Sequence, residues 1–402
     1  MHRLEFDEFL RSMKQNIDMP HSMLLGAGAS IESGIQSASG CIWDWKNELY
    51  LSQNPIMAGI SRNLKLDSVK REIQNWIDQQ GIYPEENSDN EYSYYAEKTY
   101  PIPEDRRKYF EHLIIDKSPS LGYYLIAAMA KRGIIKSVWT TNFDGMMEKC
   151  VHQYGKIVPV AITLDSVDRI YRGEVDKELL CISLHGDYKF GELKNTQKEL
   201  DTQNSVLIQA LSHELANRDL IVIGYSGRDQ SLMDALTEVY QKPGAGKLFW
   251  CGYGDHPSAA VCALLQCAEN HGRGAYYIAT DGFDNTMYML SMHCLCNDNS
   301  FIEEVNSLKK QLGQVEICGQ SKFQQFSITP TKIVGTNLHP IVIPQSCYQF
   351  EYSGKTSGWK FCRQLTNKNI MAVPRNGMIY AWGDQAQIIQ LCRDVASTFI
   401  KT

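Results

Sequence analysis

The sequence lacks any Cys-x-x-Cys pair, although 12 of its 402 residues are cysteine. The nearest spacings are Cys294 to Cys296 and Cys262 to Cys267. Paired Cys-x-x-Cys spacings are the usual sign of a structural zinc site, and disulfide frameworks belong to secreted chains. We therefore predict no metal centre and no disulfide framework, and we interpret the cysteines as reduced thiols that are mostly buried.

Long apolar runs and a signal peptide are also missing. No stretch reaches the roughly 18 apolar residues that span a bilayer, so no integral membrane protein is expected. Residues 1–20 mix charges with apolar residues at helical spacing, which predicts a surface helix. These features are typical of a cytoplasmic protein. The apolar residues at that spacing are Phe6, Phe9, Leu10, Met13 and Ile17.

An excess of positive charge is missing from most of the chain. Residues 301–402 hold 11 Lys and Arg against 6 Asp and Glu, a balance of +5. The whole chain has 40 against 46, so the remainder has 29 against 40, a balance of −11. An acidic body argues against a direct nucleic-acid site. The basic tail could contact an acidic partner or another copy of the chain in a homo-oligomer.

The composition is otherwise that of a globular protein, with 43% hydrophobic and 10% aromatic residues. Short apolar runs alternate with helical patterns between residue 22 and about residue 290. This alternation predicts an α/β fold, a doubly wound, Rossmann-like parallel sheet covered on both faces. The predicted strands are Ser22–Leu25, Ile134–Trp139, Ile157–Ile162, Leu179–Leu184, Leu220–Ile223, Lys247–Gly252 and Ala275–Ile278. The predicted helices include Leu121–Lys131, Gln230–Tyr240 and Ser258–Glu269.

Two changes of composition divide the chain. Residues from about 43 to 118 are polar and aromatic with Pro-marked breaks, which predicts a helical insertion above the sheet. Residues 296–402 predict a smaller α+β C-terminal domain, an oligomer or partner interface, after a first domain of residues 1–295. Its predicted helices are Phe301–Leu312 and Gln385–Ile400, and its predicted strands are Lys332–Val334, Pro340–Ile343, Cys347–Tyr352, Ile370–Val373 and Met378–Trp382.

Four motifs follow predicted strands at their carboxyl ends, the edge at which doubly wound sheets bind ligands. The first is Gly26-Ala27-Gly28-Ala29-Ser30. Its glycines would permit a tight turn and the close approach of a pyrophosphate to a helix N-terminus. Because Ile31 stands where a GxGxxG motif has its third glycine, an ordinary tight turn is the alternative.

The other three motifs each offer hydrogen-bonding or ionisable side chains. Thr140-Thr141-Asn142-Phe143-Asp144 could bind a ribose or an amide, or Asp144 could only cap the next helix. In Leu184-His185-Gly186-Asp187, the histidine could act on a hydroxyl, or it could be a structural residue. The glycines and serine of the run from Ile223 to Asp229 could bind a phosphate or ribose through backbone N–H groups.

Together these four motifs resemble the sirtuin fold family, and most closely its bacterial NAD hydrolases of anti-phage defence. The tract Ile42-Trp43-Asp44-Trp45-Lys46 and the run from Ile223 to Asp229 resemble that branch. The resemblance covers residues 22 to about 290 and implies NAD+ as the substrate. It implies catalytic roles for Asn142 and His185. It further implies NAD+ binding by Gly26, Ala27, Gly28, Ser30, Asp144, Gly224, Ser226 and Gly227.

The sequence departs from sirtuin deacylases where those enzymes carry a four-cysteine zinc module. No cysteine occurs between Cys181 and Cys251, so no zinc is expected and deacylation is disfavoured. The resemblance then implies hydrolysis of NAD+ to nicotinamide and ADP-ribose, depleting cellular NAD in abortive infection. It also implies that assembly or a partner gates this activity. The layout of the chain resembles that of the subunit that pairs with a HerA-type ATPase. The alternatives are an NAD or ADP-ribose sensing or scaffolding module, and a protein ADP-ribosyltransferase or deacylase.

Overall fold

The computed structural model describes residues 2–55, 63–64, 66–88, 90–172, 175–184, 204–312, 347–352, 357–366, 370–375, 378–383, 386 and 396–401. The chain divides into two compact units, Met1–Cys294 and Leu295–Thr402. Each unit is described by itself.

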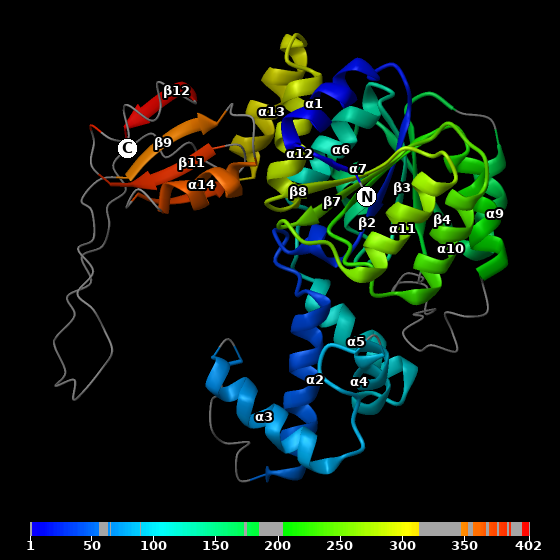
Figure 1. Ribbon diagram of the computed structural model, residues 1–402, viewed down its shortest axis with the longest axis vertical. Coiled ribbons are helices and arrows are strands. Elements are labelled where there is room, and N and C mark those ends of the chain that lie inside the picture. Colours follow the sequence, from blue (N-terminus) through cyan, green and yellow to red (C-terminus); the bar gives the residue numbers. More distant parts are fainter. Residues whose placement is uncertain are drawn as a thin grey trace. The chain divides into compact units, whose positions relative to one another are not determined.

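The first unit is built on an eight-stranded sheet in the order β1-β8-β7-β6-β2-β3-β5-β4, in which every neighbouring pair is parallel (Figure 1). The doubly wound α/β prediction is therefore confirmed. The strands are β1 (His2–Leu4), β2 (His21–Leu25), β3 (Ile135–Thr140), β4 (Val158–Thr163), β5 (Glu178–Ser183), β6 (Asp219–Ile223), β7 (Leu248–Tyr253) and β8 (Ala275–Thr280). Seven of them match predicted strands, whereas β1 was not predicted because three residues carry no readable alternation.

Helices cover both faces of this sheet, as expected for strands that are apolar on both sides. One face carries α1 (Phe6–Gln15), α6 (Leu121–Lys131), α7 (Met146–Tyr154) and α12 (Phe283–Cys294) (Figure 1). The other carries the 3-10 helix η3 (Leu164–Tyr171), α9 (Asn204–Leu215), α10 (Gln230–Gln241) and α11 (Ala259–Asn270). The predicted N-terminal surface helix is α1, and it buries its apolar face through Phe6, Phe9, Leu10 and Met13.

In the described residues, four α-helices lie in the region predicted as an insertion between β2 and α6. They are α2 (Ala38–Gln53), α3 (Asp67–Gln80), α4 (Glu91–Thr99) and α5 (Pro103–Ile114). Trp45 is buried at their centre, with its ring 5.0 Å from that of Tyr92. Lys46 is also buried, forms an ion pair with Glu91 and donates to Gln74 at 2.9 Å. The tract around Trp45 thus holds the insertion together.

The second unit contains a helix α13 (Asn299–Gln311) and a four-stranded antiparallel sheet covered by helix α14 (Gly358–Thr366). The sheet order is β10-β11-β9-β12, with β9 (Cys347–Tyr352), β10 (Met371–Arg375), β11 (Met378–Trp382) and β12 (Ala396–Lys401). The predicted closing helix Gln385–Ile400 is wrong at its end, because residues 396–401 pair with β9 as a strand. The predicted strands Lys332–Val334 and Pro340–Ile343 lie outside the described residues.

Candidate functional site

The strands that carry the four motifs are neighbours, in the order β6-β2-β3-β5. Because these strands are parallel, their carboxyl ends meet at one edge of the sheet. The chain leaves β2 for β3 on one side and returns as β6 on the other, so this edge is the topological switch point of the sheet. The motif of β5 continues at His185, which lies outside the described residues. The structure brings the other three motifs together.

The glycines after β2 and β6 allow two backbones to touch. Gly28 N donates to Gly224 O at 2.8 Å, and a Cβ atom on Gly28 would lie 2.8 Å from Gly224 Cα. A Cβ on Gly26 would lie 2.6 Å from the same carbonyl oxygen, and Gly224 itself has a φ of +70°. The missing side chains at these glycines therefore let the two loops approach one another closely, and the predicted contact of Gly26 and Gly28 with a pyrophosphate stays a prediction.

The side-chain amide of Asn142 is held in one orientation. Its Nδ2 atom donates to Gly26 O at 3.0 Å and to Ser30 Oγ at 3.1 Å. Because a backbone carbonyl only accepts, the nitrogen of the amide must face Gly26. Both amide hydrogens are used, and Oδ1 makes no hydrogen bond with the described part of the chain. Oδ1 is therefore the amide atom left for a ligand.

Ser30 is the centre of the network behind this amide. Its hydroxyl donates to Asp144 Oδ2 at 2.5 Å and lies 2.8 Å from Tyr123 OH. Since the serine proton goes to Asp144, the serine oxygen accepts from Tyr123 and Asn142. Burial, with the Asp144 carboxylate as the next cause, holds the pKa of Tyr123 well above its ordinary range. The phenol therefore keeps the proton that it donates to Ser30.

Asp144 serves both the helix and the site. Its Oδ1 atom accepts from Met146 N at 2.9 Å at the start of α7, as the helix-cap interpretation predicts. Its Oδ2 atom holds Ser30, and the residue also lines the cavity at the edge of the sheet. The two interpretations of Asp144 are thus compatible.

The loop after β6 forms the opposite side of the site. Gly227 has a φ of +77°, and Asp229 caps α10 by accepting from Leu232 N at 3.3 Å. Tyr225 donates to Asp229 O at 3.4 Å, and burial raises the pKa of this tyrosine well above its ordinary range. Gly224 and Ser226 line the cavity with these residues. The loop is therefore fixed at both of its ends.

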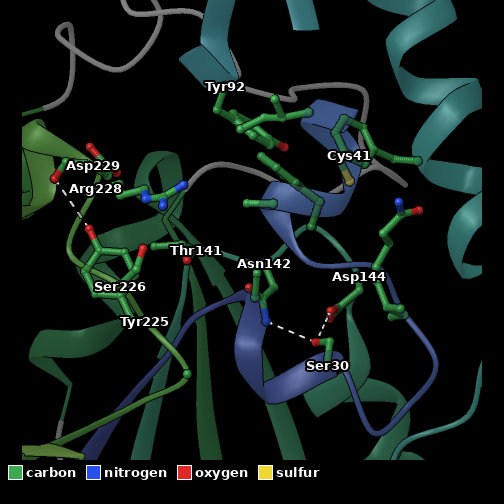
Figure 2. A pocket seen from close by; sticks show the side chains of 18 of the residues that line it. Ser30, Cys41, Tyr92, Thr141, Asn142, Asp144, Tyr225, Ser226, Arg228 and Asp229 are labelled. Carbon is green, nitrogen blue, oxygen red and sulfur yellow. Dashed lines mark hydrogen bonds between the residues drawn. The ribbon is translucent and has the colours of Figure 1, made fainter. Parts of the chain in front are cut away.

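A cavity of about 290 Å³ lies where the loops meet the helical insertion (Figure 2). Ala27, Ser30, Thr141 and Asn142 line it from the sheet side. The insertion supplies a mainly apolar wall, consisting of Ala38, Cys41, Ile42, Tyr92, Phe110, Leu113 and Ile114. A concave site with an apolar wall and a few fixed polar groups is the usual form of a small-molecule site.

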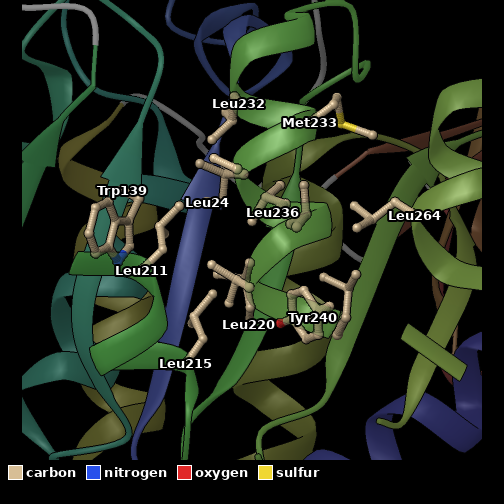
Figure 3. Packing of buried hydrophobic residues seen from close by; sticks show 14 of the residues in the cluster. Leu24, Trp139, Leu211, Leu215, Leu220, Leu232, Met233, Leu236, Tyr240 and Leu264 are labelled. Atoms are coloured by element: carbon tan, nitrogen blue, oxygen red, sulfur yellow. The ribbon is translucent and has the colours of Figure 1, made fainter. Parts of the chain in front are cut away.

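The strands below these loops are anchored by a large apolar core. Leu24 of β2 and Trp139 of β3 are at most 1% exposed and belong to the cluster that α9 and α10 complete (Figure 3). The motif residues lie just beyond these two side chains. Functional groups are positioned more accurately when the strands that carry them are anchored in a packed core.

Several cavity residues were missed by sequence reasoning. Arg228 follows the predicted Gly224–Gly227 loop directly, so its position in that motif was the available signal. Tyr92 and Cys41 come from the insertion, and no sequence pattern shows which of its residues face the sheet. Burial raises the pKa of the Cys41 thiol to about 11, so it is a neutral part of the wall at pH 7. Within the described residues no group of His, Cys, Asp or Glu could hold a metal ion.

The fold and site define an α/β protein with a small-molecule type of cavity at the switch point of its sheet. Residues 136–270 match the family model described as a SIR2-like domain. Two proteins named NAD(+) hydrolase ThsA are similar to parts of the chain. The protein from Bacillus cereus (strain MSX-D12) is 27% identical over 109 residues, 26% of this chain and 22% of the relative. The protein from Acinetobacter baumannii (strain 532279) is 20% identical over 150 residues, 36% of this chain and 30% of the relative.

The chain thus spans less than a third of the length of either relative. Two of the solved structures to which the chain is similar are each 14% identical to it. One, titled as the structural basis for the mechanism and regulation of Sir2 enzymes, has a TM-score of 0.33 and covers 76% of this chain and 98% of that chain. The other, a Sir2 homolog–NAD complex, has a TM-score of 0.37 and covers 73% and 96%. None of the described helices is long and apolar enough to cross a membrane.

Proposed function

We propose that the protein is an NAD+ glycohydrolase, which cleaves the bond between nicotinamide and ribose to give nicotinamide and ADP-ribose. The observation that carries the proposal is the Asn142 amide, oriented by Gly26 and Ser30 at the switch point of the sheet. The match to a SIR2-like domain and the similarity to proteins named NAD(+) hydrolase support it.

The chemistry needs little acid catalysis. When the bond between C1′ and the pyridinium nitrogen breaks, the electron pair goes to that nitrogen and nicotinamide leaves neutral. The ribose becomes oxocarbenium-like, water adds to C1′, and the added water loses one proton. The enzyme must therefore stabilise the cationic ribose and position one water.

We assign these tasks to two residues. Asn142 Oδ1 accepts a hydrogen bond from the attacking water or from a ribose hydroxyl, because its two N–H groups are already used. His185 accepts the proton of the water or polarises a ribose hydroxyl. Ser30 and Asp144 hold the amide, and Gly224, Ser226 and Gly227 bind the adenosine side. Gly26 and Gly28 shape the turn, with Ala27 on the cavity surface.

The apolar wall of the insertion gives the site a second property. Side chains such as Phe110 and Ile114 restrict water around the reacting bond. Phe110 is in ring contact with Phe143 at 5.2 Å, so the wall is packed directly against the motif that carries Asn142. We propose that closure of this wall selects one water as the nucleophile.

The test is release of nicotinamide from NAD+ by the purified protein. The assay is run with the protein alone and with the product of the neighbouring gene. We expect Asn142→Ala and His185→Ala each to lower the rate by roughly a hundredfold or more. Asn270→Ala and His271→Ala, which change exposed residues outside the cavity, are matched controls. No nicotinamide release in either condition, or unchanged rates in the two site variants, would falsify the proposal.

The other candidate functions give different products in the same assay. A sensing or scaffolding module would bind NAD+ tightly and return it intact. A protein ADP-ribosyltransferase would add the ADP-ribosyl mass to a protein, and a deacylase would remove an acyl group. Mass spectrometry of the incubated protein and nucleotide separates these outcomes from free ADP-ribose.

We further propose that the activity works in cytoplasmic anti-phage defence and is gated by assembly. Uncontrolled NAD+ consumption would harm the cell that makes the protein, so activity must be held off until infection. The candidate assemblies are a homo-oligomer and a complex with a HerA-type ATPase. Full activity of a monomer without any ATPase would rule out this form of gating.

A further inference from the structure

We propose that Arg228 binds the pyrophosphate of the dinucleotide and so makes the site selective for substrates that carry phosphate. The inference rests on the proposed function, because it assigns the part of NAD+ that remains in ADP-ribose. It concerns a residue of the Ile223–Asp229 run to which the sequence analysis assigns no role.

Arg228 is the only cationic side chain among the described residues that line the cavity. Its side chain extends from the loop after β6 toward the middle of the cavity (Figure 2). Within the described part of the chain its guanidinium makes no ion pair and no hydrogen bond. A guanidinium has five N–H donors in a planar fork that matches the oxygens of a phosphate.

The carboxylates of the same cavity have donors from the protein. Asp144 accepts from Ser30 and Met146, and Asp229 accepts from the first turn of α10. The helix therefore uses Oδ1 of Asp229, and Arg228 forms no bond with either acid, so its N–H donors are available to a ligand. Asp229 also places Arg228 directly before α10, whose N-terminal end favours an anion.

The position of Arg228 fits the length of the substrate. β6 and β3 flank β2, and neighbouring strands lie about 4.8 Å apart, so the two loops start about 10 Å apart. In NAD+ the ribose and its 5′ carbon separate the reacting C1′ from the pyrophosphate. With C1′ at Asn142, the phosphates extend toward the loop that carries Arg228.

The loop holds Arg228 between two fixed residues. On one side, Gly227 is in the left-handed region, and a Cβ atom there would lie 2.9 Å from Val261 Cγ2. On the other side, Asp229 begins α10. The backbone at Arg228 is thus set before any ligand arrives, which lowers the entropic cost of binding.

The test measures binding of ADP-ribose, AMP and adenosine to the full-length protein by calorimetry. These probes have no cleavable nicotinamide bond, so the result does not depend on turnover. We expect Arg228→Gln to weaken ADP-ribose about 10-fold to 100-fold, AMP less, and adenosine not at all, as for a charge-assisted contact. Arg11→Gln removes an equal charge from an exposed site on α1 and is the control. Unchanged thermal unfolding shows that each variant is folded.

Each outcome has one meaning. If Arg228→Gln binds ADP-ribose like the wild type, or loses adenosine and ADP-ribose equally, Arg228 is not a phosphate ligand. If the wild type binds none of the probes, the inference fails, and nicotinamide release alone decides the proposed function. If the expected pattern is found but nicotinamide is not released from NAD+, the inference stands and the hydrolase proposal fails.

Discussion

The hydroxyl of Ser30 donates a 2.5 Å hydrogen bond to the carboxylate of Asp144, and through this bond two loops of the sheet hold one another. Ser30 comes from the loop after β2, and Asp144 from the loop after β3. Ser30 also accepts from the Asn142 amide at 3.1 Å. Ser30 therefore connects the two loops, and a change in either loop can shift the proposed catalytic amide of Asn142.

Removing the hydroxyl group of Ser30 is expected to disturb the site strongly, although the substitution deletes a single atom. Ser30→Ala removes the donor to Asp144 Oδ2 and the acceptor of one Asn142 N–H, and each such loss at a buried group costs roughly 1–3 kcal/mol. We expect nicotinamide release to fall at least tenfold. Tyr123→Phe removes only one donor to Ser30 and should cost about 1 kcal/mol in stability. Equal activity of Ser30→Ala and the wild type would contradict the network.

The contact between the two glycine-bearing loops predicts a strong effect of a single methyl group. In Gly28→Ala the new Cβ would meet Gly224 Cα at 2.8 Å, a backbone atom that cannot rotate away. We expect a loss of about 1–3 kcal/mol in the free energy of unfolding and weaker ADP-ribose binding. Gly274→Ala is the control, because its nearest contact is a lysine side-chain atom at 3.2 Å. Urea unfolding of both variants decides the point.

Asp284 predicts a dependence of stability on pH. It is 1% exposed, and its Oδ1 accepts from Ser120 Oγ at 2.6 Å and Gly122 N at 2.9 Å at the start of α6. Burial raises the pKa of this carboxyl from 3.8 to about 6, against the lowering effect of those hydrogen bonds. The folded state therefore binds a proton more tightly than the unfolded state. The protonated Asp284 therefore contributes to the free energy of unfolding. This contribution is full below about pH 4 and is lost as the pH rises through about 6, a change of roughly 3 kcal/mol.

The measurement for Asp284 is a comparison of two proteins at several pH values. Asp284→Asn keeps an acceptor for Ser120 and Gly122 but carries no charge. The stability of this variant relative to the wild type should rise between about pH 4 and pH 7. Taking the difference removes the contribution of other carboxyl groups. A difference that does not change with pH would show that Asp284 titrates normally.

The buried ion pair of the insertion predicts a non-additive pair of mutations. Lys46 is 1% and Glu91 is 4% exposed, and Lys46 also lies 4.7 Å from the Trp43 ring centroid. Lys46→Met leaves a buried carboxylate without its cation and should cost about 3–5 kcal/mol in stability. Adding Glu91→Gln should restore most of that loss. Because Glu91 precedes Tyr92 of the cavity wall, ADP-ribose binding should also be weakened by Lys46→Met and mostly restored by adding Glu91→Gln. Additive losses of stability in the double variant would contradict this explanation.

Much of the fold could be predicted because its signals are local. The runs at Ser22–Leu25 and Leu220–Ile223 are apolar at every position, and only a strand buried on both faces uses so short a run. The helix prediction for the closing segment was wrong at its end because residues such as Thr398 and Ile400 are compatible with a helix or a strand. Pairing with β9 decides between the two. The three-residue strand β1 likewise depends on pairing with β8.

The candidate site was predictable to a smaller extent. Asn142, Asp144 and Gly224 follow strands directly, so their common edge could be inferred once the sheet was taken as parallel. Their bonds could not be inferred, since Ser30 lies 93 positions from Tyr123 and 114 positions from Asp144. The wall residues Cys41 and Tyr92 face the cavity only because of how the insertion packs.

The sequence by itself determined the class of fold, the edge at which the motifs lie and the lack of paired cysteines, because alternation and spacing are properties of neighbouring residues. Only the tertiary structure decided that Gly26 and Gly28 accommodate a second loop, and that Gly26 and Ser30 accept both N–H groups of the Asn142 amide. It also decided that Arg228 is the only cation among the described residues that line the cavity. Such relationships arise from contacts between distant segments, and their energies depend on burial and direction that no local pattern contains.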